Sequence, residues 1–120
     1  LSIRRQRQMC IRDRVNTGKE NNKSGIFPED TKDFVFFLRN EMKLSIQGLM
    51  CIPPLNDDPT YHFSKLKFLA SQNNINDLSI GMSGDYEKAL QFNPTYIRLG
   101  TILFGKRLCK VSYLFIMTQR

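Results

Sequence analysis

The sequence predicts an α/β fold with a parallel sheet of three to four strands, and three observations support this prediction. Short apolar runs typical of strands alternate with longer segments that carry apolar residues at helical spacing. Acidic residues and prolines stand where the helical segments begin. The 120 residues suffice for one domain. Strands that alternate with helices form right-handed βαβ units, so the strands are expected to be parallel.

The first elements are predicted between residues 15 and 43. A possible strand enters the polar segment VNTGKENNKSG at Val15, and its upstream half is missing. The segment FPEDTKDFVFFLRNEMK then predicts a helix, because Pro28 suits a first helical turn and the acids that follow favour the positive helix end. The apolar residues at helical spacing in this segment are Phe34, Phe37, Leu38 and Met42.

A buried strand and a second helix are predicted next. The run LSIQGLMCIPP is short, apolar and closed by two prolines, so the strand should end near Cys51 or Ile52. Asp58 is the predicted N-cap, with Pro59 at the first helical position. The buried stripe predicted for this helix is Phe63, Leu66, Leu69 and Ala70.

The remaining regular elements follow in the same alternation. DLSIGMS predicts a strand, GDYEKALQF a short helix, TYIRLG another strand and TILFGK a helical turn. A closed (β/α)8 barrel takes about 250 residues, so this chain could form roughly half of one. A small open sheet is the alternative.

The net charge of +7 is concentrated at the two ends of the chain. Five arginines fall within residues 1–14, and residues 106–120 carry basic residues without an acid, whereas residues 15–105 are close to neutral. We therefore expect no nucleic-acid partner. A basic nucleic-acid-binding module is the alternative, and salt-sensitive binding retained by residues 15–107 would support it.

Cysteine usage and hydropathy predict a cytoplasmic protein without a metal site. Cys10, Cys51 and Cys109 form no CxxC pair, which argues against a disulfide framework and a zinc site. No apolar run reaches the roughly 20 residues that cross a bilayer, and no signal peptide is visible. Cys51 is expected in the core, and His62 at a surface or half-buried position.

The two ends of the chain are set apart from the regular part. Residues 1–14, LSIRRQRQMCIRDR, show neither the helical nor the strand spacing of apolar residues. They also resemble translated sequencing-adapter read-through, so we expect them to be non-native or disordered. Residues 108–120 are a tail of uncertain origin.

Candidate binding residues follow the strands, because the carboxyl ends of parallel strands meet at one rim. Ser83 and Gly84 stand between a strand and a helix, and Gly100 and Thr101 stand at the next such junction. Hydroxyl and free backbone N–H groups at a helix start can bind phosphate. The alternative for Ser83 is an ordinary N-cap of its own helix. Arg98 either points to solvent or pairs with a carboxylate such as Asp77.

Four blocks of the sequence, in this order and spacing, resemble the C-terminal half of the pyridoxal-phosphate homeostasis proteins (YggS/PROSC type): VNTGKENNKSGI, IQGLMCIPP, LSIGMSGDYEKAL and YIRLGTILFG. The resemblance covers residues 15 to about 107. It implies an incomplete TIM barrel of the alanine-racemase-like kind, and a protein that binds pyridoxal 5'-phosphate (PLP) and maintains its supply without catalysing a reaction. It further implies a monomeric parent that delivers PLP to apo-enzymes.

The resemblance also implies roles for individual residues. Ser83, Gly100 and Thr101 would bind the cofactor phosphate, and Met82 together with Met50 would line the ring pocket. Arg98 would lie against the pyridine nitrogen, and because arginine stays protonated it would keep that nitrogen unprotonated and weaken the ring as an electron sink.

The chain departs from the family pattern at the covalent anchor. The family's Schiff-base lysine lies in a VSK motif on the first barrel strand, and neither this motif nor the HFIG segment that follows it occurs here. We therefore expect a truncated fragment that binds PLP weakly or not at all. A fragment of an alanine-racemase-like PLP enzyme is the alternative, although racemisation needs acid/base groups on both faces of the cofactor.

Overall fold

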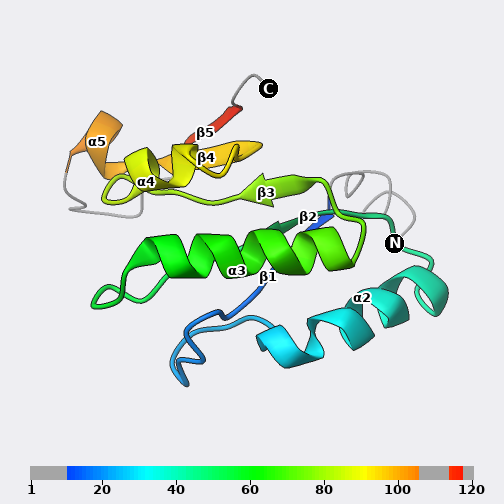
Figure 1. Cartoon of the computed structure of the whole chain (residues 1–120). Helices are drawn as coiled ribbons and strands as arrows, with labels where there is room; N and C mark the ends of the chain where they lie inside the picture. Colours follow the sequence, from blue (N-terminus) through cyan, green and yellow to red (C-terminus); the bar gives the residue numbers. More distant parts are fainter. Residues whose placement is uncertain (1–10, 106–113, 118–120) are drawn as a thin grey trace.

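The computed structural model describes residues 11–105 and 114–117. Figure 1 shows one sheet with its helices. The elements in chain order are β1 (Ile11–Arg14), the 3-10 helix η1 (Pro28–Asp30), α2 (Thr31–Asn40), β2 (Ile46–Met50), α3 (Pro59–Gln72), β3 (Asp77–Ser79), α4 (Tyr86–Leu90), β4 (Tyr96–Leu99), α5 (Thr101–Phe104) and β5 (Leu114–Met117).

The sheet has the order β1-β2-β3-β4-β5. The first four strands are parallel, which confirms the predicted α/β fold with a parallel sheet, and their registers include Leu49 opposite Leu78 and Ser79 opposite Tyr96. β5 pairs with β4 in the antiparallel direction. This fifth strand was not predicted, and it lies in the tail that the sequence sets apart.

The first strand begins earlier than the sequence predicts. β1 occupies Ile11–Arg14, so the last four residues of the segment that we expected to be non-native or disordered form a strand. Val15 forms an isolated bridge with Ile26, and its N–H donates to the Met50 carbonyl at 2.7 Å. Backbone pairing with β2 satisfies polar groups of the segment whatever its side-chain pattern, which is why periodicity misses the strand.

The helix predicted over residues 27–43 forms, but its buried stripe differs from the expected one. It begins as the 3-10 turn η1 and continues as α2, whose buried residues are Thr31, Val35 and Leu38. Phe37 and Met42 are exposed, while Phe34 packs partly against the core. The i, i+4, i+7 spacing of the buried residues places them on one helical face.

α3 forms as predicted, with both its start and its stripe confirmed. Asp58 accepts a hydrogen bond from the Thr60 N–H at 3.1 Å, and Pro59 occupies the first turn. Phe63, Leu66 and Ala70 are buried, and Leu69 packs partly against the same core. The core therefore lies between the sheet and the helices α2, α3 and α4.

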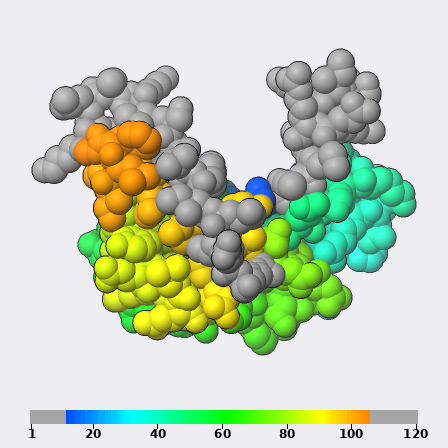
Figure 2. All heavy atoms as spheres, turned by 90° about the horizontal axis from the view of Figure 1, so that it is seen from above, coloured from blue at the N-terminus to red at the C-terminus, as the bar shows by residue number. Residues whose placement is uncertain are grey.

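The loops that follow β2, β3 and β4 open at one end of the sheet, at the left of Figure 1. Seen from above, α4 and α5 lie on one side of the molecule and α2 on the other (Figure 2). None of the described helices has both the length and the apolar composition needed to cross a membrane.

Candidate functional site

A pocket of about 400 Å³ lies at the carboxyl ends of the parallel strands. Its walls are the β2–α3 loop from Ile52 to Asp57, the β3–α4 turn with Met82 and Ser83, and the start of α5 with Gly100 and Thr101. Parallel strands bring these loops to the same rim although they are distant in sequence. Four of the five predicted site residues, Met82, Ser83, Gly100 and Thr101, therefore line one pocket.

Ser83 connects the two later loops of this pocket. Its hydroxyl oxygen accepts a hydrogen bond from the Ile102 N–H at 3.1 Å, in the first turn of α5. The N-cap of α4 is Asp85, so the alternative that Ser83 caps its own helix is wrong. The Ser83 oxygen thus lies at the start of α5, where the first backbone N–H groups of a helix have no partner within the helix. An oxygen atom of a bound anion can occupy this kind of position.

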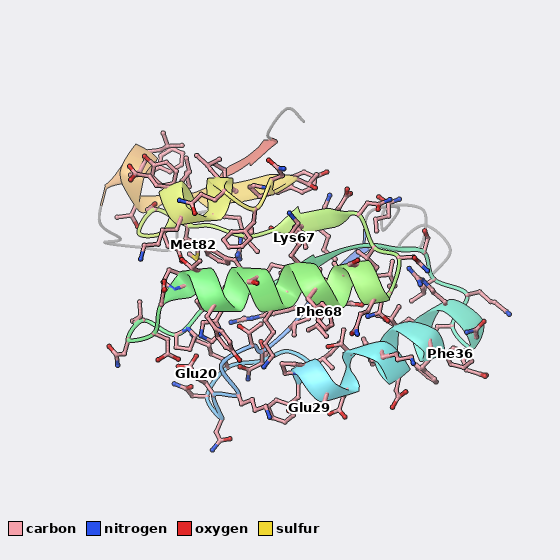
Figure 3. All side chains as sticks on the ribbon, viewed as in Figure 1. Glu20, Glu29, Phe36, Lys67, Phe68 and Met82 are labelled. Carbon is pink, nitrogen blue, oxygen red and sulfur yellow. The ribbon has the colours of Figure 1, made fainter. Side chains whose placement is uncertain are left out.

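Met82 and Asp85 shape the turn that carries Ser83. The Asp85 carboxylate accepts a hydrogen bond from the Met82 N–H at 2.6 Å. The half-buried Met82 side chain lies between the start of α3 and α4 (Figure 3). Met50, the other methionine that the resemblance assigns to a ring pocket, is not among the residues that line this one.

Arg98 is buried in the sheet, with an exposed fraction of 6%. Its Nη2 donates to the Cys51 carbonyl at 2.9 Å, and its backbone N–H donates to the Gly81 carbonyl at 2.9 Å. The alternative of an arginine directed to solvent is therefore wrong. Arg98 lies outside the pocket lining and ties the end of β2 to β4.

Charged side chains that the sequence did not single out surround the pocket mouth. Asp57, Asp85 and Lys88 line it, and Lys88 Nζ lies 3.5 Å from Asp58 Oδ1. Its place in the sequence could have suggested Lys88 as a residue of the site, because Lys88 lies on the short helix α4 that directly follows the GMSGD turn. Its partner comes from a loop thirty residues earlier, which no local pattern indicates.

His62 differs from its predicted exposure. It is buried, with an exposed fraction of 3%, and its Nε2 lies 3.4 Å from Asp57 Oδ2. In residues 11–105 and 114–117, no three His, Cys, Asp or Glu side chains gather closely enough to hold a metal ion.

The polar loop after β1 reaches the same rim. Lys23 Nζ donates to the Pro53 carbonyl at 3.3 Å, and Lys19 forms an ion pair with Glu29. Glu20 and Glu29 both lie at this lower edge of the molecule (Figure 3). The ammonium groups of the loop thus contact the protein itself, as expected of a structural βα loop.

Cys51 lies in the core, as predicted, and burial raises the pKa of its thiol to about 12. At about pH 8 we expect iodoacetamide to leave Cys51 unlabelled in the folded chain and to label it in urea, because thiolates are the reactive form. Peptide mass spectrometry measures this, and equal labelling rates in both conditions would contradict it.

The folded state keeps the Cys51 thiol proton to higher pH than the unfolded state does. The contribution of this thiol to stability therefore falls as the pH rises from about 9 towards 12.

Comparison with known proteins identifies relatives along most of the chain. No protein-family model matches it. It is 37% identical over 102 residues to the pyridoxal phosphate homeostasis protein of Aquifex aeolicus, covering 78% of this chain and 45% of the relative. It is 44% identical over 98 residues to the protein of the same name from Synechocystis sp., covering 74% of this chain and 45% of the relative. The chain therefore spans less than half the length of these relatives.

Solved structures agree with the sequence comparison. PipY of Synechococcus elongatus PCC7942 without PLP superimposes with a TM-score of 0.72 at 29% identity, over 80% of this chain and 49% of PipY. The structure of PipY with PLP bound gives a TM-score of 0.61 at 28% identity, over 80% of this chain and 50% of PipY. The fold is thus similar to that of about half of PipY.

Proposed function

Since the chain is related in sequence and fold to part of the pyridoxal phosphate homeostasis proteins, we propose that the protein it represents binds PLP and helps to maintain its supply. This chain contributes the end of the site that holds the cofactor phosphate. The observation that carries the proposal is the Ser83–Ile102 hydrogen bond, which joins the β3–α4 turn to the start of α5, two of the segments that line the pocket.

The residues present fit a phosphate group. The Ser83 hydroxyl and the backbone N–H groups at Gly100 and Thr101 are hydrogen-bond donors of the type that bind phosphate at helix starts. A Cβ placed at Gly84 would meet no atom within 4 Å, so the turn leaves room beside Ser83. The nearby Asp85 carboxylate already accepts from the Met82 N–H.

Arg98 would hold the ring end of the cofactor. PLP supplies an electron-withdrawing pyridine ring, which is effective as an electron sink when its nitrogen is protonated. A permanently protonated arginine beside that nitrogen disfavours its protonation. Arg98 does not line the pocket itself, and the hydrogen bond from its Nη2 to the Cys51 carbonyl fixes the guanidinium near the carboxyl end of the sheet, on the side where the loops of the pocket begin.

A cofactor carrier suits this chemistry better than an enzyme. We infer that the parent protein binds PLP without turnover, in the cytoplasm, as a monomer, and releases it to apo-enzymes. The names of the relatives support a homeostatic role. Racemisation of alanine by the purified chain with PLP would contradict the non-catalytic part of the proposal.

A titration of this chain with PLP tests the proposal directly, and we expect weak binding. In a titration followed by 1H–15N correlation NMR, we expect PLP to shift the amide signals of Ser83, Gly84, Thr101 and Ile102, and pyridoxal, which lacks the phosphate, to shift them much less. Ser83→Ala should raise the Kd for PLP about tenfold, since a hydrogen bond to a charged group is lost.

Ser64→Ala is the matched control for the loss of a serine hydroxyl. Ser64 is exposed on α3 and does not line the pocket, so its replacement should leave the Kd unchanged. If PLP shifted none of the pocket amides, the proposal would be wrong for this chain. An unchanged Kd in Ser83→Ala would remove Ser83 from the phosphate site.

A further inference from the structure

We propose that Lys88 is a second phosphate ligand of this pocket, and that it exchanges Asp58 for the phosphate when PLP binds. The inference rests on the proposed function and extends it to a residue outside the predicted site. The class of ligand is a phosphate monoester that carries two negative charges near neutral pH.

The position of Lys88 directs its ammonium group to the pocket. Lys88 lies on α4, one turn after Ser83 and Gly84, and it is among the lining residues. Side chains on a helix tilt towards its N-terminus, which here is the GMSGD turn. The 3.5 Å separation between Lys88 Nζ and Asp58 Oδ1 locates the ammonium between α4 and the start of α3.

The charges that line the pocket require a cation if a phosphate is to bind. Asp57 and Asp85 both line it, and Lys88 is the one Lys or Arg among the lining residues in the described part of the chain. Two carboxylates beside a phosphate dianion are unfavourable unless a positive charge offsets them. Backbone N–H groups and the Ser83 hydroxyl supply hydrogen bonds but no full charge.

The bond between Lys88 and Asp58 is of the kind that exchanges easily. Both side chains are largely exposed, at 56% and 66%, and exposed pairs of this type are weak. Asp58 keeps its other contact without Lys88, because its carboxylate also accepts from the Thr60 N–H as the N-cap of α3. A phosphate forms shorter and stronger charge-assisted hydrogen bonds with an ammonium group.

Two substitutions with opposite expected effects test the exchange in the full chain. Lys88→Gln should raise the Kd for PLP about tenfold, since one charge-assisted contact is lost. Asp58→Asn should lower the Kd about threefold, because it releases Lys88 from its competing partner while asparagine still caps α3. The double variant should bind like Lys88→Gln, because the gain requires the lysine.

Pyridoxal and an unrelated lysine provide the controls. The Kd for pyridoxal should be the same in the unaltered chain and in Lys88→Gln, since the proposed contact is to phosphate. Lys67→Gln, which removes an exposed lysine of α3 away from this pocket, should leave PLP binding unchanged. Amide NMR spectra of each variant verify that the fold is retained.

The outcomes separate this inference from the proposed function. If the unaltered chain binds PLP and Lys88→Gln binds it equally well, the inference is wrong and the proposed function stands. An equal loss of pyridoxal binding in Lys88→Gln would also contradict it, because Lys88 would then contact the ring or aldehyde. Absence of PLP binding by the unaltered chain would contradict the phosphate site proposed for this chain and, with it, this inference.

Discussion

Replacing Phe63 by alanine is expected to lower the free energy of unfolding by about 3–5 kcal/mol. Phe63 is fully buried on α3, and its ring packs edge-on against Phe92 with centroids 6.0 Å apart. Truncation removes apolar area from the core and leaves a cavity that rigid neighbours fill only in part. Urea unfolding followed by circular dichroism measures the change as a lower midpoint with an unchanged m-value.

Phe68→Ala is the matched control on the same helix. Phe68 is 62% exposed and points away from the core (Figure 3). Its replacement should change the free energy of unfolding by about 0.5 kcal/mol or less. A Phe63→Ala variant no less stable than Phe68→Ala would show that α3 does not pack on the sheet through the face described above.

Gly81→Ala is expected to destabilise the fold by about 3 kcal/mol and to disturb the pocket as well. Gly81 has φ +92°, and a Cβ added there would lie 2.8 Å from the Ala89 Cβ and 3.2 Å from the Tyr86 Cα. Gly81 precedes Met82 and Ser83, and its carbonyl accepts a hydrogen bond from the Arg98 N–H. A shift of the Gly81 backbone therefore moves both the turn that carries Ser83 and the strand that carries Arg98. The free energy of unfolding and the PLP-induced shift of the Ser83 amide should therefore fall together.

Gly84→Ala is the corresponding control three residues later. A Cβ at Gly84 meets no atom within 4 Å, so this change should alter stability by about 0.5 kcal/mol at most. Equal destabilisation by the two substitutions would show that neither the positive φ of Gly81 nor the contact with Ala89 sets the cost at this position.

Local signals predicted the start of α3 because they act between residues close in sequence. Asp58 caps the helix through the Thr60 N–H, two residues away, and Pro59 suits the first turn without any tertiary contact. The stripe of Phe63, Leu66 and Ala70 likewise follows from helical periodicity alone. Such features can be predicted from a single sequence.

The features that the sequence did not predict depend on distant partners. The sequence left open whether Ser83 caps α4, whereas its hydroxyl accepts a hydrogen bond from the Ile102 N–H in the first turn of α5. The Lys88–Asp58 pair and the Arg98–Cys51 hydrogen bond join segments that only the sheet order brings together. β1 was missed because backbone pairing to β2, and not an apolar period, holds it in place.

The antiparallel strand β5 has a consequence for complementation by a second polypeptide. β5 occupies the edge of β4, directly beside the strand that leads into Gly100 and Thr101. A parallel strand supplied in trans has to displace β5 before it can pair with β4. Otherwise it adds to the outer edge of β5, roughly 4.8 Å farther from the pocket. Association directly at β4 would then be a competition between β5 and the added strand.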